Sequence, residues 1–348
     1  MSLIDPHGRK IRYLRLSVTE KCNFRCRYCR SHDKTSHRDH DQNLTIQETL
    51  RLVQAFVDMG VHRVRLTGGE PLLRPGIMNL IGPLGGIPAL TDLSLSTNAF
   101  LLKDKAKALK KAGVGRVNIS LDSLNPETFG HITQGADLQR VIEGIDAALE
   151  AGLHPVKLNM VVMGGINDHE IPDMIRFAKV RNVMLRFIET MPIGVDGRAI
   201  MGHHLPMDEI CTLIQEAFGG TASAMSGVTC SQRQEQRRDN GGRDPKQGGG
   251  PARYVRVDGV GMDIGLISAV SRHFCDTCNR VRLTSQGQLV LCLGRTGQVD
   301  LRTPLRSGID HEGLKALLLS AIAQKPLKHD FSGGTKAAPE HDMSSLGG

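Results

Sequence analysis

Short apolar segments alternate with helical segments through roughly the first 195 residues, and this alternation limits the fold more than any other feature of the chain. Strands alternating with helices predict βαβ units and a parallel sheet or barrel. A complete eightfold barrel needs ~250 residues, so the pattern predicts an α/β fold with a partial (β/α)6 barrel. The expected strands are 11–19, 61–67, 92–98, 116–122, 154–162 and 183–189; the expected helices are 45–60, 103–112, 138–151 and 168–180.

The pattern changes after residue 200. A helix is expected over 206–218, and the polar, glycine-rich and basic stretch 226–251 predicts a mobile insertion. We therefore expect a barrel over 1–200 and a C-terminal α+β region over 201–348, which ends in Gly347-Gly348. Its expected elements are short strands at 254–257, 262–267, 281–284 and 288–293, and a helix at 312–324.

Three cysteines follow the first expected strand as a C-x3-C-x2-C run, Cys22, Cys26 and Cys29. Short loops allow the three thiolates to face a common point, and thiolates hold iron–sulfur clusters, usually four to a cluster. A four-iron cluster held by three cysteines would leave one iron without a protein ligand, where a small molecule could bind. The alternative is a zinc site with His32 or His37 as fourth ligand. Zinc knuckles usually pair two C-x2-C motifs, and this end of the chain has no second pair.

A second set of three cysteines lies in the C-terminal region, at Cys275, Cys278 and Cys292. A hairpin turn at 286–287 would bring Cys292 back beside the C-x2-C pair, again with one open iron. Zinc with His273 as fourth ligand remains an alternative here. The two other cysteines, Cys211 and Cys230, are not expected to be ligands.

Polar residues recur near the C-terminal ends of the expected strands, where α/β barrels place their chemistry. One such residue alone would more often be a cap or a turn, but their recurrence at one end predicts a site. Arg280 and Arg282 share a strand face, and two guanidinium groups could bind a triphosphate; a solvated pair is the alternative. The glycines of the 68–71 turn allow backbone to approach a ligand closely. The recurring residues are Arg15, the Gly68–Pro71 turn, Ser96 to Asn98, Ser120, Asp122, Lys157, Asn159, Arg186 and Glu189.

The net charge of +8 suits an anionic partner, such as a phosphate ligand or a nucleic acid. No apolar run approaches the ~20 residues of a membrane span, and the N-terminus lacks a secretory apolar region. We therefore expect a cytoplasmic chain without a membrane partner, whose cysteines bind metal rather than form disulfides. A zinc-stabilised nucleic-acid-binding module would leave the six β/α units unexplained, so no nucleic-acid partner is expected.

With both cysteine sets in place, the chain resembles the GTP 3′,8-cyclase (MoaA) family of molybdenum cofactor biosynthesis, within the radical S-adenosylmethionine (SAM) superfamily. The resemblance runs almost from end to end. Two departures are Arg30, where the family usually has Met, and Ser96, where it usually has Thr. The motifs that carry the resemblance are LRLSVTEKCNFRCRYC, VRLTGGEPLLR, NISLDSL, KLNMVV, LRFIETMPIG, SRHFCDTCNRVRLTSQGQLVLCL, KPLKHDF and the final GG.

The resemblance implies two 4Fe-4S clusters, one holding SAM and one binding the purine of GTP, and it implies site residues. Cys22, Cys26 and Cys29 would hold the SAM cluster, and Cys275, Cys278 and Cys292 the second cluster. The SAM site would comprise Tyr28, Gly69, Ser120 and Met191. The GTP contacts would be Arg15, Arg65, Ser96, Lys157, Arg186, Arg280 and Arg282. The residues placed in catalysis are Arg15, Arg280, Arg282, Gly347 and Gly348, because the tail is expected to reach into the active site.

The resemblance also implies an activity. A 5′-deoxyadenosyl radical would take the ribose 3′ hydrogen of GTP, and the product would be 3′,8-cyclo-7,8-dihydro-GTP. Implied partners are cyclic pyranopterin monophosphate synthase downstream, an electron donor such as flavodoxin or ferredoxin, and a second copy of the chain in a homodimer. A radical SAM enzyme with an auxiliary cluster acting on a peptide is the alternative within the superfamily.

Overall fold

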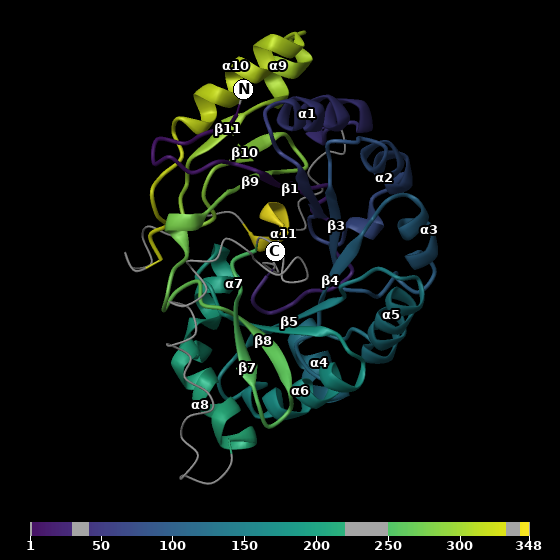
Figure 1. Ribbon diagram of the computed structural model, residues 1–348, viewed down its shortest axis with the longest axis vertical. Helices are drawn as coiled ribbons and strands as arrows, with labels where there is room; N and C mark the ends of the chain where they lie inside the picture. The colour runs from purple at the N-terminus through teal and green to yellow at the C-terminus, as the bar shows by residue number, and fades with distance from the viewer. Residues whose placement is uncertain (1, 30–41, 220–249, 332–341, 348) are drawn as a thin grey trace.

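A computed structural model describes residues 2–29, 42–219, 250–331 and 342–347, which form one 11-stranded sheet surrounded by helices (Figure 1). The strands are β1 Tyr13–Ser17, β2 Arg63–Thr67, β3 Asp92–Thr97, β4 Arg116–Ser120, β5 Lys157–Val162, β6 Met184–Glu189, β7 Arg253–Val257, β8 Met262–Ile267, β9 Arg280–Leu283, β10 Gln288–Val290 and β11 Gln298–Asp300. The helices are α1 Ile46–Asp58, η2 Pro71–Leu73, α2 Ile77–Gly85, α3 Ala106–Lys111, α4 Pro126–Thr133, α5 Leu138–Glu150, η3 Asp168–Glu170, α6 Ile171–Val180, α7 Gly194–Ala199, η4 Ile200–His203, α8 Met207–Phe218, η5 Cys275–Thr277, α9 Arg302–Arg306, α10 His311–Ile322 and α11 Met343–Leu346.

The sheet confirms the partial barrel. Strands β1 to β6 lie parallel in chain order, with helices on their outer side, and β9 and β8 extend them in parallel beyond β1 and β6. Antiparallel β10 and β11 continue one edge, and β7 continues the other. Among the described strands the order runs from β11 to β7 without closing. The strands after residue 200 thus extend the same sheet at both edges.

Several helix boundaries follow from local chemistry. Thr45 and Glu48 form a capping box at α1, as expected, which satisfies two backbone N–H groups of the first turn. The pattern analysis missed α2 and α4. Gly82 and Pro83 lower the helix propensity of α2, whereas α4 had a usable signal, because Asn125 caps it and Pro126 occupies its first turn.

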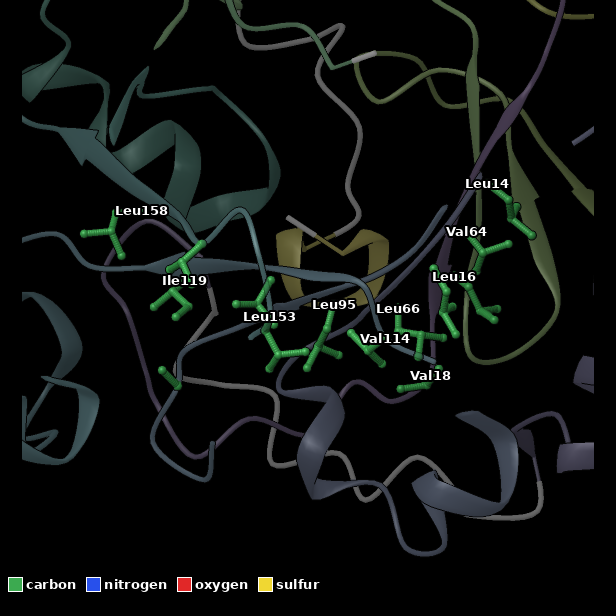
Figure 2. Packing of buried hydrophobic residues seen from close by; sticks show 14 of the residues in the cluster. Leu14, Leu16, Val18, Val64, Leu66, Leu95, Val114, Ile119, Leu153 and Leu158 are labelled. Carbon is green, nitrogen blue, oxygen red and sulfur yellow. The ribbon is translucent and has the colours of Figure 1, made fainter. Parts of the chain in front are cut away.

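Alternate residues of each strand face two different environments. Leu14 and Leu16 of β1, and Val18 just after it, pack in the apolar layer between sheet and helices, where Figure 2 shows them with partners from neighbouring strands such as Val64. The intervening Tyr13, Arg15 and Ser17 point to the opposite, inner face, as the period of two requires. The outer layer is the hydrophobic core, and the inner face carries the polar groups of the site.

No helix among the described residues is both long enough and apolar enough to span a membrane.

Replacing Thr45 by Ala should lower the free energy of unfolding by about 1 kcal/mol, because the capping bond to the Glu48 backbone N–H is lost. Urea denaturation gives the value. Thr212→Ala is the matched control, since this exposed threonine lies inside α8, where Ala is the better helix former. Equal losses in the two variants would contradict a specific role of the cap.

Candidate active site

The first cysteine run lies in the loop that follows β1. Phe24 anchors this loop edge-to-face against Phe100 and Phe129, with ring centroids 5.9 and 6.0 Å apart. Burial raises the pKa of Cys26 well above its usual value, and the neighbouring Cys29 and Cys22 sulfurs raise it further. The three sulfurs are therefore close enough to repel one another as thiolates, as the ligands of one centre must be before metal binds.

The hairpin of β9 and β10 brings Cys292 back beside Cys275 and Cys278, as the sequence predicted. Burial raises the pKa of Cys275, and Cys292 and Cys278 raise it further. For Cys278, burial is outweighed by Lys325, Arg280 and Arg282, and its pKa is lowered. Lys325 is itself buried and donates to the carbonyl of Leu291. This second triad thus has cationic neighbours that favour thiolates.

Neither triad forms a compact site for a single ion. In the described part of the chain, no three His, Cys, Asp or Glu side chains converge as ligands of one metal ion must. A four-iron cluster is larger than one ion, so its thiolates stand further apart around it. The donor chemistry, three thiolates in a short loop, suits such a cluster. His273 instead stacks edge-to-face on His329, with centroids 5.6 Å apart.

The Gly68–Pro71 turn fastens the end of β2 to the cysteine loop. A side chain at Gly69 would collide with the carbonyl oxygens of Lys21 and Glu20. The glycine therefore allows the turn to pack closely against the backbone of the cysteine loop. Glu70 is fully buried and accepts bonds from the Leu72 and Asn98 backbone N–H groups and from the Thr97 hydroxyl. Burial nevertheless raises the pKa of Glu70 to about 7.

Tyr28 donates a 2.7 Å hydrogen bond to Asp122, the residue two positions beyond β4. Burial raises the pKa of Asp122 to about 6, although the Val161 backbone N–H and the Tyr28 hydroxyl lower it. Glu189, at the end of β6, accepts from the backbone N–H groups of Met207 and Val270. Asp122, Glu189 and Glu70 therefore hold strand ends together.

The residues expected at the SAM site all lie at the C-terminal ends of strands or just beyond them. Tyr28 belongs to the cysteine loop, Gly69 follows β2, Ser120 ends β4 and Met191 follows β6. Parallel strands bring these ends to one edge of the sheet. The structure thus places the four on the same side as the first cysteine triad.

Six cationic side chains lie on the inner face: Arg65, Lys157, Arg186, Arg280 and Arg282 are buried, and Arg15 is half-buried. On neighbouring strands, Arg15 pairs with Arg65 on one side and with Arg282 on the other, and the adjacent strands β5 and β6 carry Lys157 and Arg186. In the described residues, none of the five arginines has a carboxylate partner; Arg186 donates to Asn118 at 2.5 Å, and Arg65 lies 5.4 Å above the Tyr13 ring.

Burial and mutual repulsion act on these cations together. Burial lowers the pKa of Lys157 to about 7, and Arg186, Arg116 and Arg65 lower it further. Burial likewise lowers the pKa of Arg65 and of Arg282 to about 9, and that of Arg186 to about 10. Such a concentration of buried positive charge favours the binding of an anion.

Three of these cations do not lie where the sequence analysis expected them. Lys157 is the first residue of β5, and Arg15 and Arg186 are the third residues of β1 and β6, so none is at a C-terminal strand end. The expectation was wrong because alternate residues along the whole strand face the interior. Ser96, one residue before the end of β3, also points inward, and its buried hydroxyl has no partner among the described residues.

The described end of the chain returns to the site. Gly347 has a φ of 71°, and a side chain there would collide with Thr67 at the end of β2. Its carbonyl oxygen lies 3.5 Å from Arg15 Nη1. Figure 1 shows α11 within the curve of the strands. Gly348, Arg30, His32, His37, Cys230 and most of the 226–251 insertion lie outside the described residues.

Sequence reasoning missed inward-facing residues that carry no charge. Tyr13 and Asn118 are buried on the inner face, and Tyr254 is half-buried there with its hydroxyl oxygen buried. Tyr13 had a signal, since it lies two residues before Arg15 on the same strand face. Tyr254 had none, because the position of β7 at the far edge of the sheet is not encoded locally.

Comparison with known proteins decides the family. The chain matches curated proteins named GTP 3′,8-cyclase: 45% identity to that of Hydrogenovibrio crunogenus over all of both chains, and 40% to that of Pelotomaculum thermopropionicum over 99% of both. It is 41% identical to GTP 3′,8-cyclase 2 of Pseudomonas aeruginosa, over 99% and 98% of the two chains.

The chain belongs to the GTP 3′,8-cyclase family. Family models agree: residues 16–178 match the radical SAM superfamily model, and residues 223–331 match the model of molybdenum cofactor synthesis C. The radical SAM assignment implies a 4Fe-4S cluster and SAM, and the Cys22, Cys26 and Cys29 triad fits that cluster.

Among solved structures, Streptococcus suis SuiB bound to S-adenosylmethionine has a similar fold. Its TM-score is 0.58 at 14% identity, covering 91% of this chain and 69% of SuiB. At this identity the similarity shows the fold alone.

Burial of Glu70 predicts a pH-dependent stability. Its pKa is about 7 in the folded chain and near 4.5 when unfolded, so between these values unfolding releases a proton. Stability from this group is complete below about pH 4.5 and lost as pH rises through 7. The free energy of unfolding of the cluster-free chain, relative to Glu70→Gln, should therefore fall by about 1–3 kcal/mol from pH 5 to 7. Urea titrations measure it, and a difference independent of pH would contradict it.

Proposed function

We propose that this chain converts GTP to 3′,8-cyclo-7,8-dihydro-GTP, the first step of molybdenum cofactor biosynthesis. The observation that carries the proposal is the cationic inner face of a sheet whose connecting loops carry two cysteine triads. A triphosphate supplies the negative charge that these guanidinium groups lack. Family membership supports the same substrate, because the full-length relatives are named for it.

The cysteine loop after β1 would hold the SAM cluster through Cys22, Cys26 and Cys29. Tyr28, Gly69, Ser120 and Met191 are proposed to line the SAM site beside it, at the shared edge of the strands. When bound, the cluster and SAM supply the 5′-deoxyadenosyl radical that removes the ribose 3′ hydrogen. The bond from Tyr28 to Asp122 fixes this loop against β4, which orients the SAM site.

The second triad, Cys275, Cys278 and Cys292, is proposed to hold a second 4Fe-4S cluster that binds the purine. Support comes from the hairpin that gathers the three thiols and from buried Lys325, whose charge favours thiolates. Arg280 and Arg282 lie on β9, the strand that follows Cys278. A nucleotide bound here would therefore contact both the second cluster and the guanidinium groups of Arg280 and Arg282.

The remaining cations would complete the GTP site. Arg15, Arg65, Lys157 and Arg186 are proposed to bind the nucleotide with Arg280 and Arg282, and the inward Ser96 hydroxyl to bond to it. Arg15 would act in catalysis together with the Gly347-Gly348 tail, since Arg15 already contacts the Gly347 carbonyl. Arg15 would then contact both the tail and the substrate.

Three partners follow from the proposal. Reductive cleavage of SAM needs an electron, which a donor such as flavodoxin or ferredoxin would supply. Cyclic pyranopterin monophosphate synthase would consume the product. The chain is proposed to work as a homodimer, as the family resemblance implies.

The decisive experiment measures 5′-deoxyadenosine from anaerobically reconstituted, reduced protein with SAM, in the presence and absence of GTP. We expect release that depends on GTP and is accompanied by the cyclised product. Release that is indifferent to GTP would leave the radical SAM chemistry and overturn the substrate. Absence of release at full iron and sulfide content would overturn the activity.

Replacing Arg282 by Ala should weaken GTP binding about 10- to 100-fold, since a charge-assisted bond to phosphate is lost, while SAM affinity persists. Equilibrium binding of both ligands to the reconstituted protein tests this. Arg256→Ala is the matched control, because Arg256 is an exposed arginine that faces Asp263 and Asp258. Equal GTP affinity in Arg282→Ala and wild type would remove Arg282 from the site.

A further inference from the structure

Three neighbouring strands carry Arg186, Gly265 and Tyr254 in a single row. Arg186 of β6 pairs with Gly265 of β8, which pairs with Tyr254 of β7. Paired residues point to the same face of a sheet, so Tyr254 shares the inner face with Arg186. A side chain at Gly265 would place its Cβ 2.5 Å from Arg186 Cγ and 3.2 Å from Tyr254 Cε1. The two side chains therefore come together over the glycine.

The Tyr254 hydroxyl is buried, and it has no hydrogen-bond partner in the described part of the chain. The same holds for Nε of Arg186. Burial raises the pKa of Tyr254, although Arg186, Arg116 and Arg65 oppose this. The phenol thus keeps its proton at neutral pH, and a buried donor without an acceptor is costly.

Within residues 2–29, 42–219, 250–331 and 342–347, no group accepts this proton. The charged groups that act on Tyr254 are three guanidinium groups, which only donate. Arg116 is already engaged by Asp92 through bonds of 3.0 and 2.7 Å. Packing over Gly265 explains the aromatic ring but not the hydroxyl, because Phe would cover the glycine equally well. A ligand can supply this acceptor, and beside three guanidinium groups an anionic oxygen is favoured.

We propose that Tyr254 donates a hydrogen bond to a phosphate oxygen of the substrate's triphosphate, beside Arg186. Gly265 makes this possible by leaving room for both side chains over one position. The inference rests on the proposed function, since it takes GTP as the ligand. It adds to the site a neutral donor from β7, a strand outside the six β/α units.

The test compares wild type with Tyr254→Phe, which removes one oxygen and keeps the ring over Gly265. Binding of GTP to the anaerobically reconstituted protein is measured directly, and inorganic tripolyphosphate is measured as a competitor. We expect both affinities to fall by the same factor, about tenfold or more. SAM affinity and iron content should stay at wild-type values. Thr212→Val is the control, because it removes an exposed hydroxyl on α8, outside the site; its affinity for both phosphates should not change.

Each other outcome overturns the assignment. Loss of GTP affinity without loss of tripolyphosphate affinity would move the contact to the ribose or the base. Unchanged affinities in Tyr254→Phe would reduce Tyr254 to a packing residue, as would an equal loss in Thr212→Val. Failure of tripolyphosphate to displace GTP from wild type would contradict a phosphate subsite. Failure of wild type to bind GTP is a different result, which would refute the proposed function itself.

Discussion

The two-residue period of the parallel strands is the constraint on which the rest of the structure depends. One face of each strand must be apolar to pack against the helices, and Leu14 and Leu16 of β1, with Val18 just after it, meet that requirement. The other face is then free for polar residues, and here it is lined with cations. A shift of register by one residue would place Arg15 in the apolar layer and leucines in the site, so folding and the site share one alternation.

Three glycines allow close contacts around the site, because glycine has no side chain. At Gly69 the turn after β2 touches the backbone that leads into the cysteine loop, and at Gly347 the tail touches Thr67. At Gly265 the side chains of Arg186 and Tyr254 occupy the space that a side chain at this position would fill. In all three places the vacated volume is filled by another part of this chain. These glycines therefore allow separate segments of the chain to pack closely around the site.

Much of the fold was predictable from the sequence because its signals are local. The six β/α units, the capping box at Thr45 and the hairpin that returns Cys292 all follow from periodicity and turn chemistry. The positions of β8 and β9 were not predictable, since they join the sheet beside β6 and β1, far away in the chain. The position of Lys157 at the start of β5, and the inward orientation of Tyr254 on β7, were not predicted for the same reason. Both depend on strand pairing, which no local pattern specifies.

The cationic inner face links stability to ligand binding. Without an anion, burial and repulsion lower the pKa of Lys157 to about 7 and those of Arg65 and Arg282 to about 9, so the folded chain disfavours its own charges. The apolar layer around the sheet must supply the free energy that offsets this. An anion that binds between these cations removes the penalty only in the folded state, and ligands of that kind stabilise the fold by mass action. The side chains that burial and repulsion disfavour as isolated cations are thus the ones that favour the binding of an anion.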